Sequence, residues 1–275
     1  MAAEETKYFY RFRVFNRVLH IMVIVSFLGL ALTGMSLKFA HESWAQWISW
    51  TWGGPMAARV WHRIFAVVTF MYFGLHILNI IRSWVTKGFK RTFWGPESMM
   101  PQPVDFVQAF QNIKHFLGLG PAPKWDRFTY WEKFDYFAVF WGVAIIGSTG
   151  LVLWFPTLFA KFLPGIAINA AIIVHSDEAL LAVGFIFMIH FFNTHLRPEK
   201  FPMDKVIFTG RVTLEELKEE RPAEYERIVK TGEIEKMHAE PPKHWLHNVT
   251  RVGGFLAVFT GLCLVLLIIY SMIWG

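Results

Sequence analysis

The chain has 275 residues, of which 54% are hydrophobic and 17% aromatic, and its formal net charge is +6. Soluble domains carry about 25% charged residues, whereas this chain carries 17% and concentrates its apolar residues in long runs. Its single cysteine, Cys263, excludes a disulfide framework, an all-thiolate iron–sulfur site and the Cys-x-x-Cys-His attachment of a c-type haem.

Five apolar segments are each long enough to cross a hydrocarbon core, which takes about 20 helical residues. In chain order they cover residues 18–38, 62–82, 134–155, 168–195 and 252–273. The first follows a basic stretch, but its apolar run is too long for a signal peptide and no small-residue cleavage site is evident. The sequence therefore predicts an all-α membrane protein, a single domain over residues 1–275 with five transmembrane helices.

Two connections are long enough to contain structure of their own. In the connection 83–133, apolar residues recur at helical spacing and predict an amphipathic helix at the membrane interface, at Val104, Val107, Phe110, Ile113 and Leu117. In the connection 197–251, Thr213 and Glu216 have the spacing of a capping box. This spacing predicts that a soluble helix begins there.

Lys and Arg are distributed unevenly between the connections. The N-terminal stretch has four, the connection from 82 to 133 has eight and the connection from 197 to 251 has eleven, together 23 of the 27. The positive-inside rule then places the N-terminus in the cytoplasm. With five spans, the C-terminus lies on the periplasmic side of a bacterial inner membrane. The positive charge is explained by loops at an anionic membrane surface, and not by nucleic-acid binding.

Six of the eleven histidines lie in or at the edge of predicted spans, namely His20, His62, His76, His175, His190 and His195. Ionisable residues inside a membrane are costly and usually functional. For any single histidine, a hydrogen bond to a neighbouring helix is an equally good explanation. Six histidines on three helices favour a shared role instead.

The spacing of these histidines suggests what that role is. His62 and His76 are fourteen residues apart, and His175 and His190 are fifteen apart. In α-helical geometry each pair then faces nearly one side of its helix, separated by about 21 and 22.5 Å. The second and fourth spans run in the same direction, so His62 is level with His175, and His76 with His190. Each level of a four-helix core can supply two imidazoles to one haem iron, a ligation suited to electron transfer.

Short motifs around the histidines resemble two groups of proteins. The pattern "RVLH…TG" in the first span resembles the cytochrome b (gamma) subunits of formate dehydrogenases and nickel–iron hydrogenases. The stretches "WHRIFAVVTFMYFGLH" and "HFFNTHLRPEKFPMD" are more similar to bacterial cytochrome b/b6-domain membrane proteins, which resemble subunits that pair with multihaem c-type cytochromes. The likeness spans approximately residues 10–210.

The gamma-subunit resemblance implies two b-type haems. It assigns His20 and His190 to one haem, and His62 and His175 to the other. It further implies an electron-transfer subunit that connects a quinone, such as menaquinone, with a periplasmic cytochrome c or oxidoreductase subunit. The alternatives are an electron relay without a quinone site of its own, and a non-redox membrane anchor or transporter.

His76 and His195 are extra to the gamma-subunit pattern. Depth along each helix, counted from the nearest flanking arginine, gives a different pairing. His20 and His195 lie about 3–4.5 Å inward, and His76 and His190 about 9–10.5 Å inward. In α-helical geometry His195 is also about 140° around the helix from His190 and so can face another neighbour. Two haems are expected on either pairing, and a third haem at the cytoplasmic face is the open alternative.

Three arginines flank the candidate ligands. Arg17, Arg63 and Arg197 are candidates for pairing with haem propionates. The alternative for them is positive-inside charge or snorkelling to the interface. Six glycines within the spans either admit a flat porphyrin or permit close helix packing, which is the more common role, namely Gly29, Gly34, Gly74, Gly142, Gly147 and Gly150.

Two carboxylates follow His175 in the outer half of the fourth span. Glu178, ahead of Asp177, is the candidate general base for a quinol proton. The alternative is an acid favoured by the helix end, or one that orients His175. A competing quinone position lies near the other end of this span, beside Asn193, His195 and Lys200.

Overall fold

The computed structural model describes residues 6–275, which fold into two compact units assembled from separate stretches of the chain. The first unit comprises Met1–Arg17, Ile77–Val139 and Lys205–His247. The second unit comprises Val18–His76, Phe140–Asp204 and Asn248–Gly275. All six histidines of the predicted site belong to the second unit, and most of the two long connections belongs to the first.

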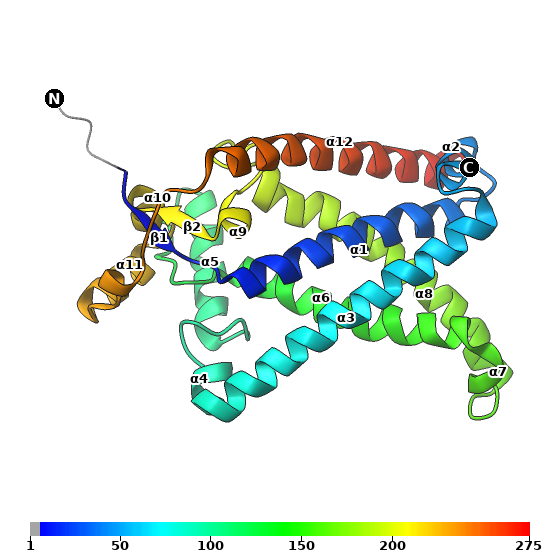
Figure 1. Cartoon of the computed structure of the whole chain (residues 1–275), viewed down its shortest axis with the longest axis horizontal. Helices are drawn as coiled ribbons and strands as arrows, with labels where there is room; N and C mark the ends of the chain where they lie inside the picture. The colour runs from blue at the N-terminus through cyan, green and yellow to red at the C-terminus, as the bar shows by residue number, and fades with distance from the viewer. Residues whose placement is uncertain (1–5) are drawn as a thin grey trace. The chain divides into compact units, whose positions relative to one another are not determined.

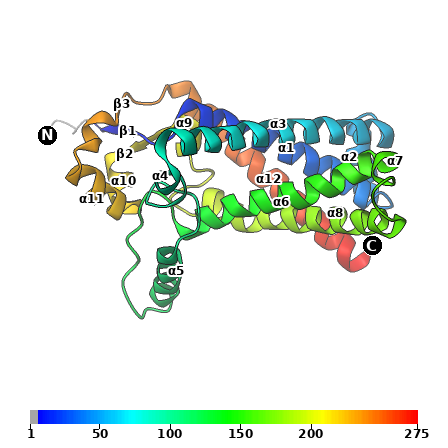
Figure 2. The ribbon, with the colours of Figure 1, turned by 90° about the horizontal axis from the view of Figure 1, so that it is seen from below.

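Five helices are long and apolar enough to cross a membrane. They are α1 (Val14–Lys38), α3 (Pro55–Lys87), α6 (Tyr130–Trp154), a helix from Gly165 to Leu196, and α12 (His244–Trp274). Figure 1 and Figure 2 show them as the longest rods of the structure. Large apolar side chains on these helices, such as Leu181 and Leu262, are exposed, as expected where lipid is the solvent. The predicted all-α architecture with five spans is confirmed.

The fourth of these helices changes its winding along its length. Its three successive segments are α8 (Gly165–Phe185) and two π-helical segments, η1 (Ile186–His190) and η2 (Phe192–Leu196). Within them Thr194 Oγ1 donates to the carbonyl of His190 at 2.8 Å, and Asn193 Nδ2 donates to that of Ile189 at 3.1 Å. Because these side chains bond to carbonyls that α-helical amides would otherwise use, they favour the wider turn.

Shorter elements connect the long helices. The helices are α2 (Ser43–Thr51), α4 (Phe89–Phe93), α5 (Pro103–Phe116), α7 (Pro156–Phe159), α9 (Val206–Thr209), α10 (Leu214–Glu220), α11 (Pro222–Lys230) and the 3₁₀-helix η3 (Glu233–Lys236). An antiparallel sheet of order β2-β1-β3 is formed by β1 (Tyr8–Tyr10), β2 (Arg211–Thr213) and β3 (His238–Ala239). This sheet was not predicted, because strands of two or three residues are too short to show an alternating pattern.

The second unit has its core between α1, α2, the fourth long helix and α12. Its buried members are Ala31, Met35, Phe39, Ala45, Val183, Phe187, Phe191, Leu264 and Ile268. Glycines bring helices close together here: a Cβ on Gly29 would meet the ring of Phe65, and a Cβ on Gly147 would lie 3.0 Å from the ring of Phe70. These contacts draw α1 and α6 onto α3, the close helix packing that small residues permit.

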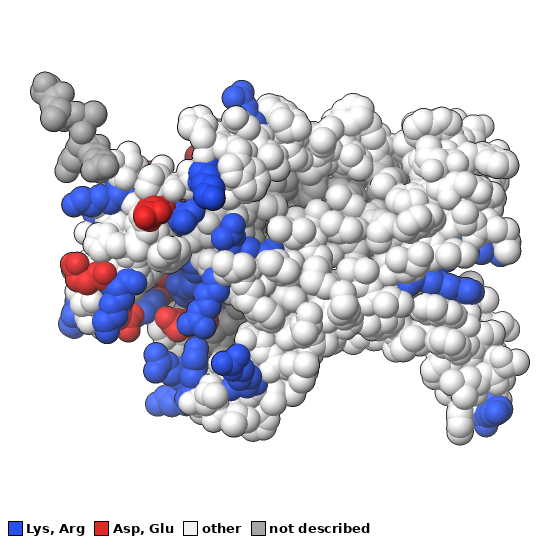
Figure 3. Space-filling view, in the orientation of Figure 1, with Lys and Arg blue, Asp and Glu red and all other residues white. Residues whose placement is uncertain are grey.

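The first unit has a separate small core beneath the sheet. Phe9, Val206, Val212, Leu217 and Ile228 are buried together. The capping box predicted from Thr213 and Glu216 is present and starts α10. Figure 3 shows blue Lys and Arg side chains crowded over this unit, whereas the second unit presents a mostly uncharged surface.

Candidate functional site

His62 of α3 and His175 of α8 face each other in the second unit. Their ring centroids are 6.2 Å apart, and the ring planes are inclined at 75°. Both side chains are partly buried. Two residues that are 113 positions apart in the sequence are therefore brought together at one level, as their helical spacing predicts.

The Nδ1 atom of each imidazole is bonded to the neighbouring helix. His62 Nδ1 lies 2.9 Å from Thr33 Oγ1 of α1, and Thr33 Oγ1 donates its hydrogen to the carbonyl of Gly29 at 2.6 Å. A hydroxyl has one hydrogen, so Thr33 accepts from the histidine. His175 Nδ1 lies 2.9 Å from the carbonyl of Ile146, which can only accept.

These bonds determine which ring nitrogen carries the proton. Nδ1 must carry the hydrogen in both His62 and His175, so Nε2 of each neutral ring retains a lone pair. A histidine that donates one N–H to a protein acceptor and keeps the other nitrogen free is the usual arrangement of a metal-binding imidazole. The arrangement can therefore supply two oriented imidazole ligands.

A Thr-Gly dipeptide holds each of these histidines. A Cβ on Gly34, beside Thr33, would lie 3.1 Å from His62 Cε1. On α6, Thr149 Oγ1 is 3.3 Å from His175 Nδ1, and a Cβ on Gly150 would lie 3.0 Å from His175 Cε1. The glycines thus make room for the imidazole rings. Only the first dipeptide belongs to the "RVLH…TG" motif. Its repetition within a second apolar span is a signal in the sequence that also points to this site.

A second group of histidines gathers around the π-helical segments. His20 of α1 lies within electrostatic range of both His190 and His195. His195 is buried, and its Nδ1 donates to the carbonyl of Pro202 at 2.9 Å. The predicted offset of about 140° between His190 and His195 assumed α-helical turns. The π-helical turns, with bonds between residues five apart, have more residues per turn and therefore reduce this offset.

His76 occupies a different environment. Its ring makes an edge contact with Phe140 of α6, with centroids 5.7 Å apart. Its pairing with His190 stays a prediction.

The three flanking arginines have protein contacts. Arg17 Nε donates to the carbonyl of Phe208 at 2.7 Å, and Arg197 pairs with Glu199. The Arg63 guanidinium lies 5.5 Å from the ring of Trp154, a cation–π contact. Their pairing with propionates stays a prediction.

The two candidate acids have different surroundings. Asp177 is exposed and forms an ion pair of 2.9 Å with Lys38, the last residue of α1. Lys38 also donates to Ser176. Glu178 is partly buried. Of the two, Asp177 is already neutralised by a basic neighbour.

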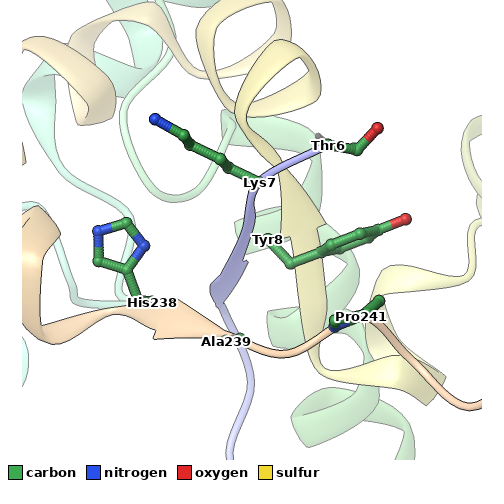
Figure 4. Close-up of a pocket in the computed structure, with 6 residues that line it drawn as sticks. All are labelled: Thr6, Lys7, Tyr8, His238, Ala239 and Pro241. Atoms are coloured by element: carbon green, nitrogen blue, oxygen red, sulfur yellow. The ribbon is translucent and has the colours of Figure 1, made fainter. Parts of the chain in front are cut away.

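Clusters of metal ligands and surface pockets are the other kinds of site that could bind a ligand. Among residues 6–275, no group of three or more His, Cys, Asp or Glu side chains is placed to hold a metal ion by itself. A surface pocket of about 210 Å³ lies in the first unit beside the sheet, lined by Thr6, Lys7, Tyr8, His238, Ala239 and Pro241. Figure 4 shows Lys7 and Tyr8 extending to opposite sides of β1. None of the predicted site residues lines this pocket.

The fold and the site together define a multi-pass helical membrane protein whose core presents two facing imidazoles. No protein-family model matches the chain. The chain is 19% identical over 226 residues to the cytochrome b556(Fdn) subunit of nitrate-inducible formate dehydrogenase from Escherichia coli K12. The same subunit of Escherichia coli O157:H7 and of Shigella flexneri matches equally well. The alignment covers 82% of this chain and 94% of each relative, a distant similarity to a cytochrome b subunit.

Proposed function

We propose that the chain is a membrane-bound haem b subunit that transfers electrons between a quinone and a redox partner. The observation that carries the proposal is the facing pair His62 and His175, each with Nδ1 bonded to protein and Nε2 free. The named relatives are cytochrome b subunits, which supports the same conclusion. The histidine pair supports the haem, whereas the quinone site and the redox partner are further parts of the proposal.

The residues present fit a haem. Two metal–imidazole bonds of about 2 Å each can be accommodated between rings whose centroids are 6.2 Å apart. When bound there, a haem would supply reversible one-electron chemistry, and His62 and His175 would hold its iron. Thr33 Oγ1 and the Ile146 carbonyl accept hydrogen bonds from the two Nδ1–H groups. These bonds fix the orientation of the imidazole rings and increase the basicity of Nε2.

We assign a second haem to His20 and His190. The gamma-subunit resemblance pairs these residues, and His20 lies within electrostatic range of His190 as well as of His195. His195 is the alternative, because its Nδ1 bond to Pro202 leaves Nε2 free in the same manner as in the first pair. His76 is then surplus to both haems, unless it belongs to a third.

Replacement of each histidine separates these assignments. His20→Ala or His190→Ala is expected to remove one haem and leave the other, because a low-spin iron needs both imidazoles. His195→Ala and His76→Ala are expected to retain both haems. The readout is haem per protein by pyridine haemochrome, together with the low-spin signals in electron paramagnetic resonance.

Two results would change the assignment. Loss of the second haem in His195→Ala but not in His190→Ala would establish the depth-based pairing with His20. Loss of a haem in His76→Ala, with two remaining, would show a third site.

We further propose that the first unit lies in the cytoplasm. Most of the sequence of this unit belongs to the two positively charged connections. The positive-inside rule places these connections in the cytoplasm. The C-terminus of α12 and the His62–His175 pair are then on the periplasmic side of an inner membrane. A periplasmic oxidoreductase or cytochrome c is the partner that this orientation favours. The relatives are subunits of a redox enzyme, formate dehydrogenase.

Quinol oxidation releases protons as well as electrons, so a quinone site needs a base. Glu178 is the better candidate, because Lys38 already binds Asp177. Glu178→Gln is expected to slow haem reduction by a menaquinol analogue by about 10²-fold or more, with haem content unchanged. Asp177→Asn, one position away, is the matched control and is expected to retain most of the rate.

An unchanged rate in Glu178→Gln, with both haems present, would contradict the periplasmic quinone site. The position beside Asn193, His195 and Lys200 would then be the better candidate. Absence of any quinol-driven reduction in the unmodified protein, with dithionite reduction intact, would instead identify an electron relay without a quinone site.

A further inference from the structure

Helix α5 (Pro103–Phe116) has its polar face turned inward and its apolar face turned outward. Asp105 and Asn112 are buried, at 6% relative exposure each. In contrast, Phe106 and Phe110 are 75% and 59% exposed. At 100° per residue, Asp105 and Asn112 share one face of the helix. Phe106, Val107, Phe110, Ile113 and Leu117 are all exposed and lie between about 80° and 200° around the helix axis from Asp105.

The inward polar face is used by the protein itself. Lys133 Nζ donates to both carboxylate oxygens of Asp105, at 2.8 and 2.9 Å, in a buried ion pair. Asn112 Nδ2 donates to the hydroxyl of Tyr130 at 3.2 Å. Tyr130 and Lys133 are in the first turn of α6, so these bonds attach α5 to the point where a membrane span begins (Figure 2).

The outward face is formed by large apolar side chains that are exposed, and exposure of such side chains to water is unfavourable. Exposed apolar patches of this kind mark sites of interaction with a protein or a membrane. The same unit contains exposed Trp84 and Phe89 at the end of α3 and the start of α4. It also contains exposed basic residues in and beside these helices, at Lys87, Lys90, Arg91, Lys114 and Lys124.

We propose that the outward face of α5 lies in the headgroup layer of the bilayer and binds anionic phospholipid. Its attachment to the first turn of α6 puts it at the depth where that span leaves the hydrocarbon core. Interfacial helices combine an apolar face with Lys and Arg, and aromatic residues anchor at this depth. Lys114 Nζ lies 4.9 Å from the centroid of the Phe110 ring. A lysine beside an apolar face can snorkel, with its methylene groups on the apolar surface and its ammonium group among the lipid headgroups.

The test uses the full chain, with Cys263 replaced by Ser, reconstituted into phosphatidylglycerol–phosphatidylethanolamine vesicles. An environment-sensitive fluorophore is attached to Phe110→Cys on the outward face. Glu226→Cys on α11, an exposed position of the same unit, is the matched control. The label at position 110 is expected to emit at shorter wavelength, and lipids brominated near the headgroup should quench it several times more strongly than the label at 226.

Haem content is measured in both variants, so that failure of this proposal is distinct from failure of the haem proposal. Equal, water-like emission at both positions would overturn the membrane location. Short-wavelength emission at position 110 without quenching by brominated lipid would also overturn it, and would indicate that a second copy of the chain covers the face. Quenching that persists unchanged in phosphatidylcholine vesicles would contradict the preference for anionic lipid.

Discussion

Replacing His62 or His175 with Ala is expected to remove one of the two proposed haems and to leave the other in place. The two rings face each other with centroids 6.2 Å apart, and the hydrogen bonds at Nδ1 leave both Nε2 atoms available. Because six-coordinate low-spin iron needs two axial imidazoles, loss of either has the same consequence. The haem content per chain should fall by half in both variants.

His41→Ala is the matched control, since that side chain is 64% exposed and belongs to the same unit. It should retain the full haem content. Unchanged haem content in both His62→Ala and His175→Ala would show that this pair does not bind haem. Loss of both haems would indicate that the variant does not fold. Comparing its far-ultraviolet circular dichroism spectrum with that of the unmodified protein detects such a failure.

The hydrogen bond to Thr33 offers a finer measurement on the same pair. Thr33→Val keeps His62 but removes the acceptor for its N–H, so the ligand becomes less basic and the midpoint potential of that haem should rise. Thr33→Ser restores the hydroxyl and should return the potential toward that of the unmodified protein. A purely structural role for Thr33 would not change the potential in this graded manner.

Replacing Glu224 with Ala is expected to destabilise the first unit by about 3–5 kcal/mol. Glu224 is fully buried and accepts from Arg11 at 2.5 Å and from Arg127 at 2.9 Å. Each arginine also donates to the backbone carbonyl of the other. Burial, followed by the neighbouring Arg11 guanidinium, lowers the pKa of Arg127, whereas Glu224 counteracts both effects. Without Glu224, the buried Arg11 and the partly buried Arg127 would both lose the carboxylate that they share.

These contacts join three distant segments of the first unit, namely the end of β1, the approach to α6 and α11. Hydrogen exchange should therefore accelerate at the amides of β1, β2 and α11 in the variant. Glu226→Gln is the control, because its ion pair with Lys124 is exposed and is worth about 0–1 kcal/mol. Equal exchange in Glu224→Ala and Glu226→Gln would contradict the structural role of the buried cluster.

The parts of this structure that follow from periodicity were predictable from the sequence. The five spans are long apolar runs, and hydrophobic length alone identifies them. The opposition of His62 and His175 follows from equal depth on two parallel helices. The spacing of apolar residues predicted the helix over Val104–Leu117. It did not predict which face of that helix is buried, because the burial depends on the ion pair between Asp105 and Lys133, 28 positions apart.

Other features depend on contacts that a pattern does not contain. The π-helical turns around His190 and His195 accompany bonds from the side chains of Asn193 and Thr194 to carbonyls, and α-helical arithmetic does not include such turns. The sheet pairs β1 with strands about 200 residues away. The role of Thr149 and Gly150 required knowing that α6 packs beside His175.

The absorption spectrum of the purified full chain tests the central proposal most directly. The chain is reduced first with a menaquinol analogue and then with dithionite, and haem is counted as the pyridine haemochrome. We expect a b-type spectrum, a stoichiometry of two haems per chain, and reduction by the quinol before dithionite is added. A purified, folded chain without b-type absorption would contradict the haem proposal and leave a non-redox membrane protein as the better interpretation.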